Sequence, residues 1–495
     1  MWSRAAGEAG RGNEVSGAEA PRFRVSSRGE KTPMTRTPVL RALGIAGWDA
    51  LEPAILAALA TESPILLVGA HGSAKTLLFA RLAEALGLAF RHYNASILSF
   101  DDLLGYPVPQ DGRLVYLETP ATIWQAEAVL FDEVSRCRPE LQNKLFPLIH
   151  ERVAQGVPLA RLKHRWAAMN PPPREGGRNA FEYEGAEPLD VALADRFPFV
   201  LEVPTLDQLG EEDRRAVLLG QGRPEAAAAR ALQEAVTAAK TLLGEAEREL
   251  RETAVEYTDV LAAQLGAAGH PLSTRRAVTL ARNIESLRAA ERALDVEPRN
   301  LEDSFYSAAR ASLPDAAWGR PVEGHVLLAA HRAAWEAARL ARDAPERALL
   351  AETDPLRRIA LALRLDLPAA EAGAVIADGF SALSRPERLV TSAALFPRLG
   401  RKPGLPSSAL EAVADAYAAV ARGGKQSVVV RQGGRDWKRE LLGTKLAKLD
   451  PKRRRDRVLQ NAAAVLMADD ERFDLEALKA AWERARQALE GEPRP

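Results

Sequence analysis

The stretch Ser63–Ala83, SPILLVGAHGSAKTLLFARLA, decides how the rest of the chain is arranged. It opens with the apolar run Ile65 to Val68, which is typical of a buried strand, and continues through a glycine-containing loop into an amphipathic helical pattern. A strand, a tight loop and a helix start in this order are the context of a phosphate-binding P-loop. The amides of the loop and of the helix N-terminus would converge on anionic phosphates. We therefore expect this loop to bind a nucleotide.

The expected nucleotide contacts come from one continuous segment: Gly69, Ala70, His71, Gly72, Ser73, Ala74, Lys75, Thr76 and Leu77. Lys75 would reach the β- and γ-phosphates, and the Thr76 hydroxyl would help to hold Mg²⁺. Ala74 stands where the G-x-x-x-x-G-K-[ST] pattern has its second glycine. A methyl group there limits positive φ but still allows close approach of the backbone, so we interpret Ala74 as a tolerated variant. The alternative is a strand–helix turn with an incidental lysine.

Length and composition limit the classes of protein to which the chain can belong. Its 495 residues are too many for one compact core, so about two to four domains are expected. Lys and Arg together number 67, as do Asp and Glu, and this balance argues against a dedicated binder of nucleic acid or anionic membrane. The single cysteine, Cys137, cannot form an intramolecular disulfide, and no apolar run is long enough for a membrane span or a signal peptide. We expect a soluble, cytoplasmic protein.

Two carboxylates follow a second apolar run, Ala128 to Phe131. Asp132 would hold Mg²⁺ directly or through water, and Glu133 would polarise the attacking water. A strand that leaves a core often ends in charge, so the pair alone is a weak signal. Its position after Lys75, with further strands between, makes the pair a much stronger one.

Three further segments are expected to contribute: one more strand that ends in a polar residue, and two hairpins. The strand over 165–170 ends in Asn170, which could hydrogen-bond the lytic water or the γ-phosphate, although an Asn before Pro is also a routine turn former. Residues 101–124 form an expected insertion with a hairpin, with a plain surface loop as the alternative, and 151–164 could form another hairpin. The seven histidines show no metal-ligand spacing and are interpreted as ordinary polar residues.

The series GAHGSAKT, VLFDE, WAAMN, ALADRF and LSTRR, in that order, resembles the AAA+ superfamily and within it the MoxR-like group of the helix-2-insert clade. The resemblance covers residues 38–290. It implies that Asn170 is sensor 1, that Arg196 is the arginine finger and that Arg275 is the sensor 2 arginine, with Arg276 as the close competitor. It also implies a ring, usually a hexamer, because an arginine finger acts on the γ-phosphate of the neighbouring subunit.

The resemblance implies an α/β fold: an AAA+ P-loop αβα sandwich with an α-helical lid and an additional C-terminal helical region. Residues 1–36 are rich in Gly, Ser, Arg and Glu with little apolar periodicity, so we expect a disordered tail there. The domains expected after it are a nucleotide-binding core over 37–205, a lid over 206–300 and a mainly helical region over 301–495. Met34 could be the true start of translation.

The activity implied by the resemblance is ATP hydrolysis with ATP and Mg²⁺ as ligands, by a motor that remodels or activates a protein client. Members of the group often work with a partner that carries a von Willebrand factor type A domain. One alternative is the motor subunit of a metal chelatase. A nucleic-acid-linked AAA+ ATPase is another, although neutral charge and 6% aromatic residues argue against it. A third is a nucleotide-gated scaffold whose ATPase activity is incidental.

Overall fold

The computed structural model describes residues 37–173, 187–220, 223–295, 300–423, 437–469 and 471–490. The expected disordered tail over 1–36, with Met34, lies outside these residues. The first described elements are the short helix α1 (Val39–Ala42) and helix α2 (Glu52–Ala60), which precede the P-loop strand.

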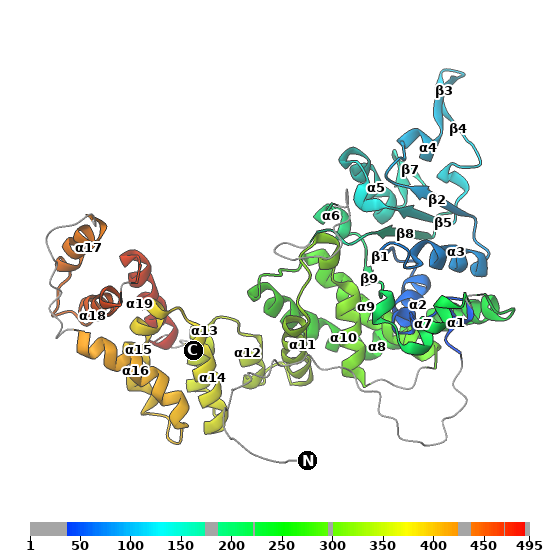
Figure 1. The fold of residues 1–495 in the computed structure, drawn as a ribbon. Coiled ribbons are helices and arrows are strands. Elements are labelled where there is room, and N and C mark those ends of the chain that lie inside the picture. The colour runs from blue at the N-terminus through cyan, green and yellow to red at the C-terminus, as the bar shows by residue number, and fades with distance from the viewer. Residues whose placement is uncertain are drawn as a thin grey trace, which may run out of the picture. The chain divides into compact units, whose positions relative to one another are not determined.

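Five parallel strands form the central sheet in the order β2-β5-β8-β1-β9 (Figure 1). They are β1 (Ile65–Val68), β2 (Phe90–Asn94), β5 (Ala128–Asp132), β8 (His164–Met169) and β9 (Phe199–Glu202). The register places Val68 beside Met169 on one side and beside Glu202 on the other. Because all five strands run the same way, their carboxyl ends share one edge of the sheet, and the residues that follow them gather there.

Alternate residues of the strands enter two separate buried clusters, one on each face of the sheet. Leu67 and Leu130 belong to the first cluster, while Leu66 and Phe131 belong to the second. The first face is covered by α2, α3 (Lys75–Leu86) and α10 (Leu301–Ser312). The same cluster extends outward to α8 (Ala228–Ala267), α9 (Thr274–Ala293) and α11 (Gly324–Arg339), which pack on these helices. The second face is covered by α4 (Phe100–Leu104), α5 (Pro139–Glu151) and α6 (Val191–Ala194). The expected α/β class, with helices on both faces of a parallel sheet, is confirmed.

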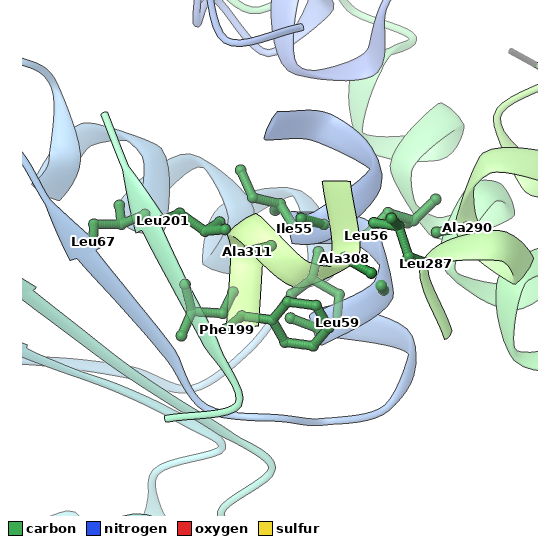
Figure 2. Close-up of a cluster of buried hydrophobic side chains, with 14 of the residues drawn as sticks. Ile55, Leu56, Leu59, Leu67, Phe199, Leu201, Leu287, Ala290, Ala308 and Ala311 are labelled. Carbon is green, nitrogen blue, oxygen red and sulfur yellow. The ribbon is translucent and has the colours of Figure 1, made fainter. Parts of the chain in front are cut away.

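Helices from the segment expected to be the lid share this first cluster with the sheet. Figure 2 shows the side chains that join the sheet, α2, α9 and α10: Ile55, Leu56, Leu59, Leu67, Phe199, Leu201, Leu287, Ala290, Ala308 and Ala311. The same cluster continues past residue 300 into α10 and α11. The division at residues 205 and 300 therefore stays a prediction, and the buried core is continuous across residue 300.

The C-terminal region is helical in its described residues, as expected. Its helices are α12 (Pro345–Ala351), α13 (Pro355–Arg364), α14 (Ala369–Ala382), α15 (Arg385–Leu399), α16 (Ser407–Gly423), α17 (Trp437–Ala447), α18 (Arg454–Ala468) and α19 (Leu475–Glu490). Two further hydrophobic clusters hold them together, one centred on α13 and α14 and the other on α15 and α18. Even α8, which has 40 residues, is not apolar enough to cross a membrane, and neither is any other helix in the described ranges.

Both expected hairpins form. The larger consists of β3 (Tyr106–Gln110) and β4 (Arg113–Leu117), which follow α4. The cross-strand pairs Tyr106–Leu117 and Val108–Val115 lie on the same face of this ribbon, and all four side chains are exposed. The smaller consists of β6 (Val153–Ala154) and β7 (Val157–Pro158), with its turn at 155–156. The larger hairpin therefore presents an apolar surface to solvent.

Candidate functional site

Five of the expected site residues meet at the carboxyl edge of the sheet: Lys75, Thr76, Asp132, Glu133 and Asn170. The Thr76 hydroxyl donates to Asp132 Oδ2 at 2.7 Å, which joins the start of α3 to the end of β5. The Asn170 amide, directly after β8, donates to Glu133 Oε2 at 3.2 Å and accepts from Lys75 Nζ at 3.3 Å. Residues that are far apart in the sequence therefore form one hydrogen-bonded group.

Lys75 is folded back onto the P-loop. Its ammonium group donates to the carbonyls of Gly69 and Ala70, at 2.8 Å each. Burial lowers the pKa of Lys75 from its ordinary value, while the nearby carboxylates of Asp132 and Glu133 oppose this shift. The contacts hold a buried cation beside the loop whose amides are suited to bind phosphate.

Ala74 adopts the backbone conformation that glycine usually supplies in this loop. Its φ is +67° and its ψ is +18°, so the backbone is in the left-handed region directly before α3, despite the methyl group. Residue 74 therefore has a positive φ even though it carries a methyl group. The loop conformation is retained, and the side chain makes it more strained than it would be with glycine.

Replacing Ala74 by Gly is expected to raise the free energy of unfolding by about 1 kcal/mol, because the strain at positive φ is relieved. Urea unfolding followed by circular dichroism would measure the change. Gly72→Ala is the matched reverse control: Gly72 has φ +71° and an added Cβ would meet nothing within 4 Å, so strain alone should destabilise that variant. An Ala74→Gly protein that is less stable than the wild type would contradict the strain argument.

The side-chain oxygens of Thr76 and Asp132 are suited to bind a divalent cation. Burial alone would raise the pKa of Asp132, but hydrogen bonds from His92, Thr76 and the Glu133 amide outweigh it and hold the pKa below its usual value. The carboxylate is therefore ionised at neutral pH, and the Thr76 hydroxyl lies next to it. Mg²⁺ is typically held by one or two such protein oxygens together with phosphate and water. Thr76 and Asp132, the two expected metal residues, thus have suitable chemistry and lie in contact.

Glu133 is held where it could act on a water molecule. Its φ is +55°, and its Oε2 contacts both Asn170 Nδ2 and, at 3.4 Å, Arg136 Nε. Asn170 is fully buried, and its Nδ2 also lies 3.4 Å from His71 Nε2 on the P-loop. A carboxylate positioned by an amide in this way can serve as a general base.

The two expected arginines lie at the other edge of the sheet. Arg196 comes three residues before β9, while the P-loop follows β1, and these two strands are parallel neighbours. Strands of four residues therefore put about 13 Å between the two edges. Arg196 Nη1 donates to the Ala192 carbonyl at 2.5 Å, and its guanidinium lies 4.5 Å from the centre of the Phe146 ring. The structure does not bring Arg196 to the P-loop of its own chain.

Arg275 and Arg276 differ sharply in their surroundings. The Arg276 side chain is 1% exposed and donates to Asp195 and to the carbonyls of Ala194, Phe197, Pro198 and Ser312. Arg275 is 44% exposed, and its guanidinium lies 3.9 Å from Asp195 Oδ2, so it sits at the same edge as Arg196. Arg276 thus stabilises the fold, and Arg275 is the arginine that a ligand or another chain could reach.

A cavity of about 780 Å³ adjoins the P-loop. Residues 70–74 line one side, and the remaining wall combines apolar side chains (Ile45, Trp48, Leu77, Leu206, Leu209, Val217 and Leu219) with charged ones (Arg41, Glu212, Arg215, Arg223 and Glu225). Four of these, Leu77, Leu206, Val217 and Leu219, are between 42% and 57% exposed. Helix α7 (Glu211–Leu218) is tied to the segment before β1 through Arg41, which pairs with Asp49 and Asp213 at 2.7 Å each. The cavity is large enough for a nucleotide base, and its apolar side chains offer a surface on which the base could pack.

Sequence reasoning missed two contributors to this region. The apolar side chains of α7 follow a helical period that predicts only an ordinary surface helix. His92 lies on β2, and its Nε2 is 3.2 Å from Asp132 Oδ2 although the two residues are 40 positions apart. No local spacing could have indicated that contact.

Comparison with known proteins relates part of the chain to one family. The family profile described as AAA domain (dynein-related subfamily) matches residues 64–197. Chaperone MoxR1 of Mycobacterium tuberculosis is 29% identical over 161 residues, which are 32% of this chain and 41% of that protein. Uncharacterized protein YeaC of Bacillus subtilis is 28% identical over 151 residues, 30% of this chain and 45% of that protein. The chain thus spans less than half the length of either relative.

A solved structure from Cytophaga hutchinsonii aligns with a TM-score of 0.37 and 22% identity, over 51% of this chain and 79% of its own, and this weak likeness carries no argument. The family match covers the part of the chain that holds the P-loop. Residues 64–197 match the AAA domain profile, and the resemblance to MoxR-like AAA+ ATPases is confirmed.

Proposed function

We propose that this chain is an ATP-hydrolysing motor that works as a ring of copies, with ATP and Mg²⁺ bound at each boundary between subunits. The observation that carries the proposal is the position of the site residues. Lys75 and Glu133 lie at the carboxyl edge of the sheet, whereas Arg196 and Arg275 lie at the opposite edge. One chain therefore holds both halves of a hydrolytic site but cannot join them, and two copies packed edge to edge could.

Each residue has a distinct role in this proposal. Lys75 and the loop amides bind the phosphates, while Thr76 and Asp132 hold the cation. Bound Mg²⁺ would neutralise charge on the phosphate oxygens. Glu133 polarises the attacking water, and Asn170 fixes both Glu133 and Lys75 through its amide.

The arginines complete the site from the neighbouring copy. A guanidinium beside the γ-phosphate stabilises the charge that develops as the phosphoryl group is transferred. In the proposal Arg196 supplies this charge and Arg275 adds a second cation from the same edge. Arg275, which is expected to be the sensor 2 arginine, would therefore act on the nucleotide bound by the adjacent subunit.

The motor would act on a protein client in the cytoplasm, as a chaperone-like remodeller or activator. The exposed face formed by Tyr106, Val108, Val115 and Leu117 supports a protein client, because exposed apolar patches are common at protein contacts. The similarity to a relative named as a chaperone supports the same reading. A hexamer and a partner with a von Willebrand factor type A domain are part of this proposal.

Mass photometry of the Glu133→Gln variant with and without ATP tests the proposed function. ATP should shift the protein from a monomer to a species of several copies, because the bound nucleotide is shared between subunits and is not consumed. The double variant Lys75→Ala/Glu133→Gln is the control and should stay monomeric, since it lacks the phosphate-binding lysine. If the Glu133→Gln variant remains a monomer with ATP bound, the chain is a nucleotide-binding scaffold and the ring is wrong.

A further inference from the structure

His92 lies at the edge of the expected cation site, and none of the roles assigned above includes it. It is on β2, the strand at one end of the sheet, and its side chain is 43% exposed. Its Nε2 is 3.2 Å from Asp132 Oδ2, and the described part of the chain offers the ring no other hydrogen-bond partner. Packing of the core therefore does not account for a histidine at this position.

The direction of this hydrogen bond follows from the chemistry of its partner. An aspartate carboxylate is ionised at neutral pH and can only accept hydrogen bonds. The His92 Nε2–H group must therefore be the donor. Oδ2 of Asp132 accepts from His92 and Thr76, and Oδ1 accepts from the Glu133 amide at 2.9 Å. Three donors from three segments fix the rotation of one carboxylate.

The hydroxyl of Thr76 has a further task when a cation is bound, because its lone pair must then face the metal. With the cation bound, the Thr76 hydroxyl can still donate its hydrogen bond to Asp132, but its orientation must then suit both Asp132 and the cation. His92 is the other donor to Oδ2, and among the described residues its ring has Asp132 as its single hydrogen-bond partner. Loss of the His92 donor would leave the carboxylate free to turn away from Thr76.

We propose that His92 is a positioning residue for the Mg²⁺ site, holding the Asp132 carboxylate toward Thr76 through its Nε2–H group. The inference rests on the proposed function, since it concerns the cation that accompanies ATP. Hydrogen-bond partners of metal ligands typically affect metal affinity by about 10–100-fold. His92 should therefore influence the contribution of Mg²⁺ to nucleotide binding and leave binding without Mg²⁺ unchanged.

The test compares binding of a fluorescent ATP analogue in Mg²⁺ and in EDTA, which reports on the site without requiring turnover. His92→Phe keeps a ring of similar size and removes the donor, and phenylalanine is well tolerated in strands. His92→Gln can place an amide N–H near the position of Nε2. His325→Phe makes the same chemical change on α11, where the histidine is exposed.

The gain in affinity that Mg²⁺ confers should fall about 10-fold in His92→Phe, return largely in His92→Gln, and stay at the wild-type value in His325→Phe. The positioning role is overturned if His92→Phe keeps the full gain, or if it weakens binding equally in Mg²⁺ and EDTA. It is also overturned if Gln fails to restore what Phe loses. A wild-type protein that shows no gain from Mg²⁺ would overturn the proposed function itself, and measuring the wild type first separates the two failures.

Discussion

Replacing Glu133 by Gln is expected to stop ATP hydrolysis while ATP remains bound. Gln keeps the size of the side chain and an oxygen that can accept from Asn170 Nδ2, which contacts Glu133 Oε2 at 3.2 Å. It cannot take up a proton from the attacking water, and general bases of this kind contribute about 10²–10⁴-fold to rate. We expect phosphate release to fall by at least about 10²-fold, with the dissociation constant for ATP changed little.

The control for this variant is Glu140→Gln, on an exposed position at the start of α5. It makes the same chemical change within the same segment and should hydrolyse ATP like the wild type. If Glu133→Gln also turned over ATP at close to the wild-type rate, Glu133 would not be the general base. The assignment of catalysis to the residue that follows β5 would then be wrong.

Replacing Arg196 by Ala is expected to lower kcat by about 10³–10⁵-fold, the range observed for arginine fingers in nucleotide hydrolases. Binding of ATP should persist, because Lys75 and the P-loop lie at the other edge of the same chain. Steady-state phosphate release and binding of an ATP analogue would measure the two effects separately. The loss should appear in kcat rather than in KM, since the charge is needed most in the transition state.

An exposed arginine on another helix serves as the matched control. Arg230 lies on α8 with a largely exposed side chain paired to Glu234, so Arg230→Ala should leave hydrolysis unchanged. An Arg196→Ala protein that binds ATP weakly but keeps its kcat would contradict the assignment. It would mean that Arg196 supports the fold around Phe146 and Ala192 and does not act on the nucleotide.

The nucleotide half of the site could be predicted from the sequence because its signals are local. A four-residue apolar strand must be buried, and the loop and helix that follow it have few alternatives. The same reasoning placed Asp132 and Asn170 at strand ends, and parallel pairing then brings strand ends together. The chemistry of these residues therefore followed from short motifs once the sheet was parallel.

Other features depend on contacts that no motif contains. Arg275 and Arg276 are neighbours, and which of them is buried is decided by Asp195 and Ser312, which are distant in the sequence. The positive φ of Ala74 costs only about 1 kcal/mol, which the packing of a whole loop can outweigh. The segment on both sides of residue 300 is helical, so the periodicity could not show that one buried cluster continues through it.

The measurement that tests the central claim most directly is hydrolysis by a mixture of Lys75→Ala and Arg196→Ala proteins. Lys75→Ala lacks the phosphate-binding lysine and keeps the arginine, whereas Arg196→Ala has the reverse defect, so each alone should be inactive. If the site is shared between copies, an equal mixture assembles some boundaries with both intact halves. Random assembly in a head-to-tail ring gives about a quarter of the boundaries this composition. We therefore predict up to about a quarter of the wild-type rate, and a mixture that assembles but stays as inactive as its components would contradict a site completed by the neighbouring chain.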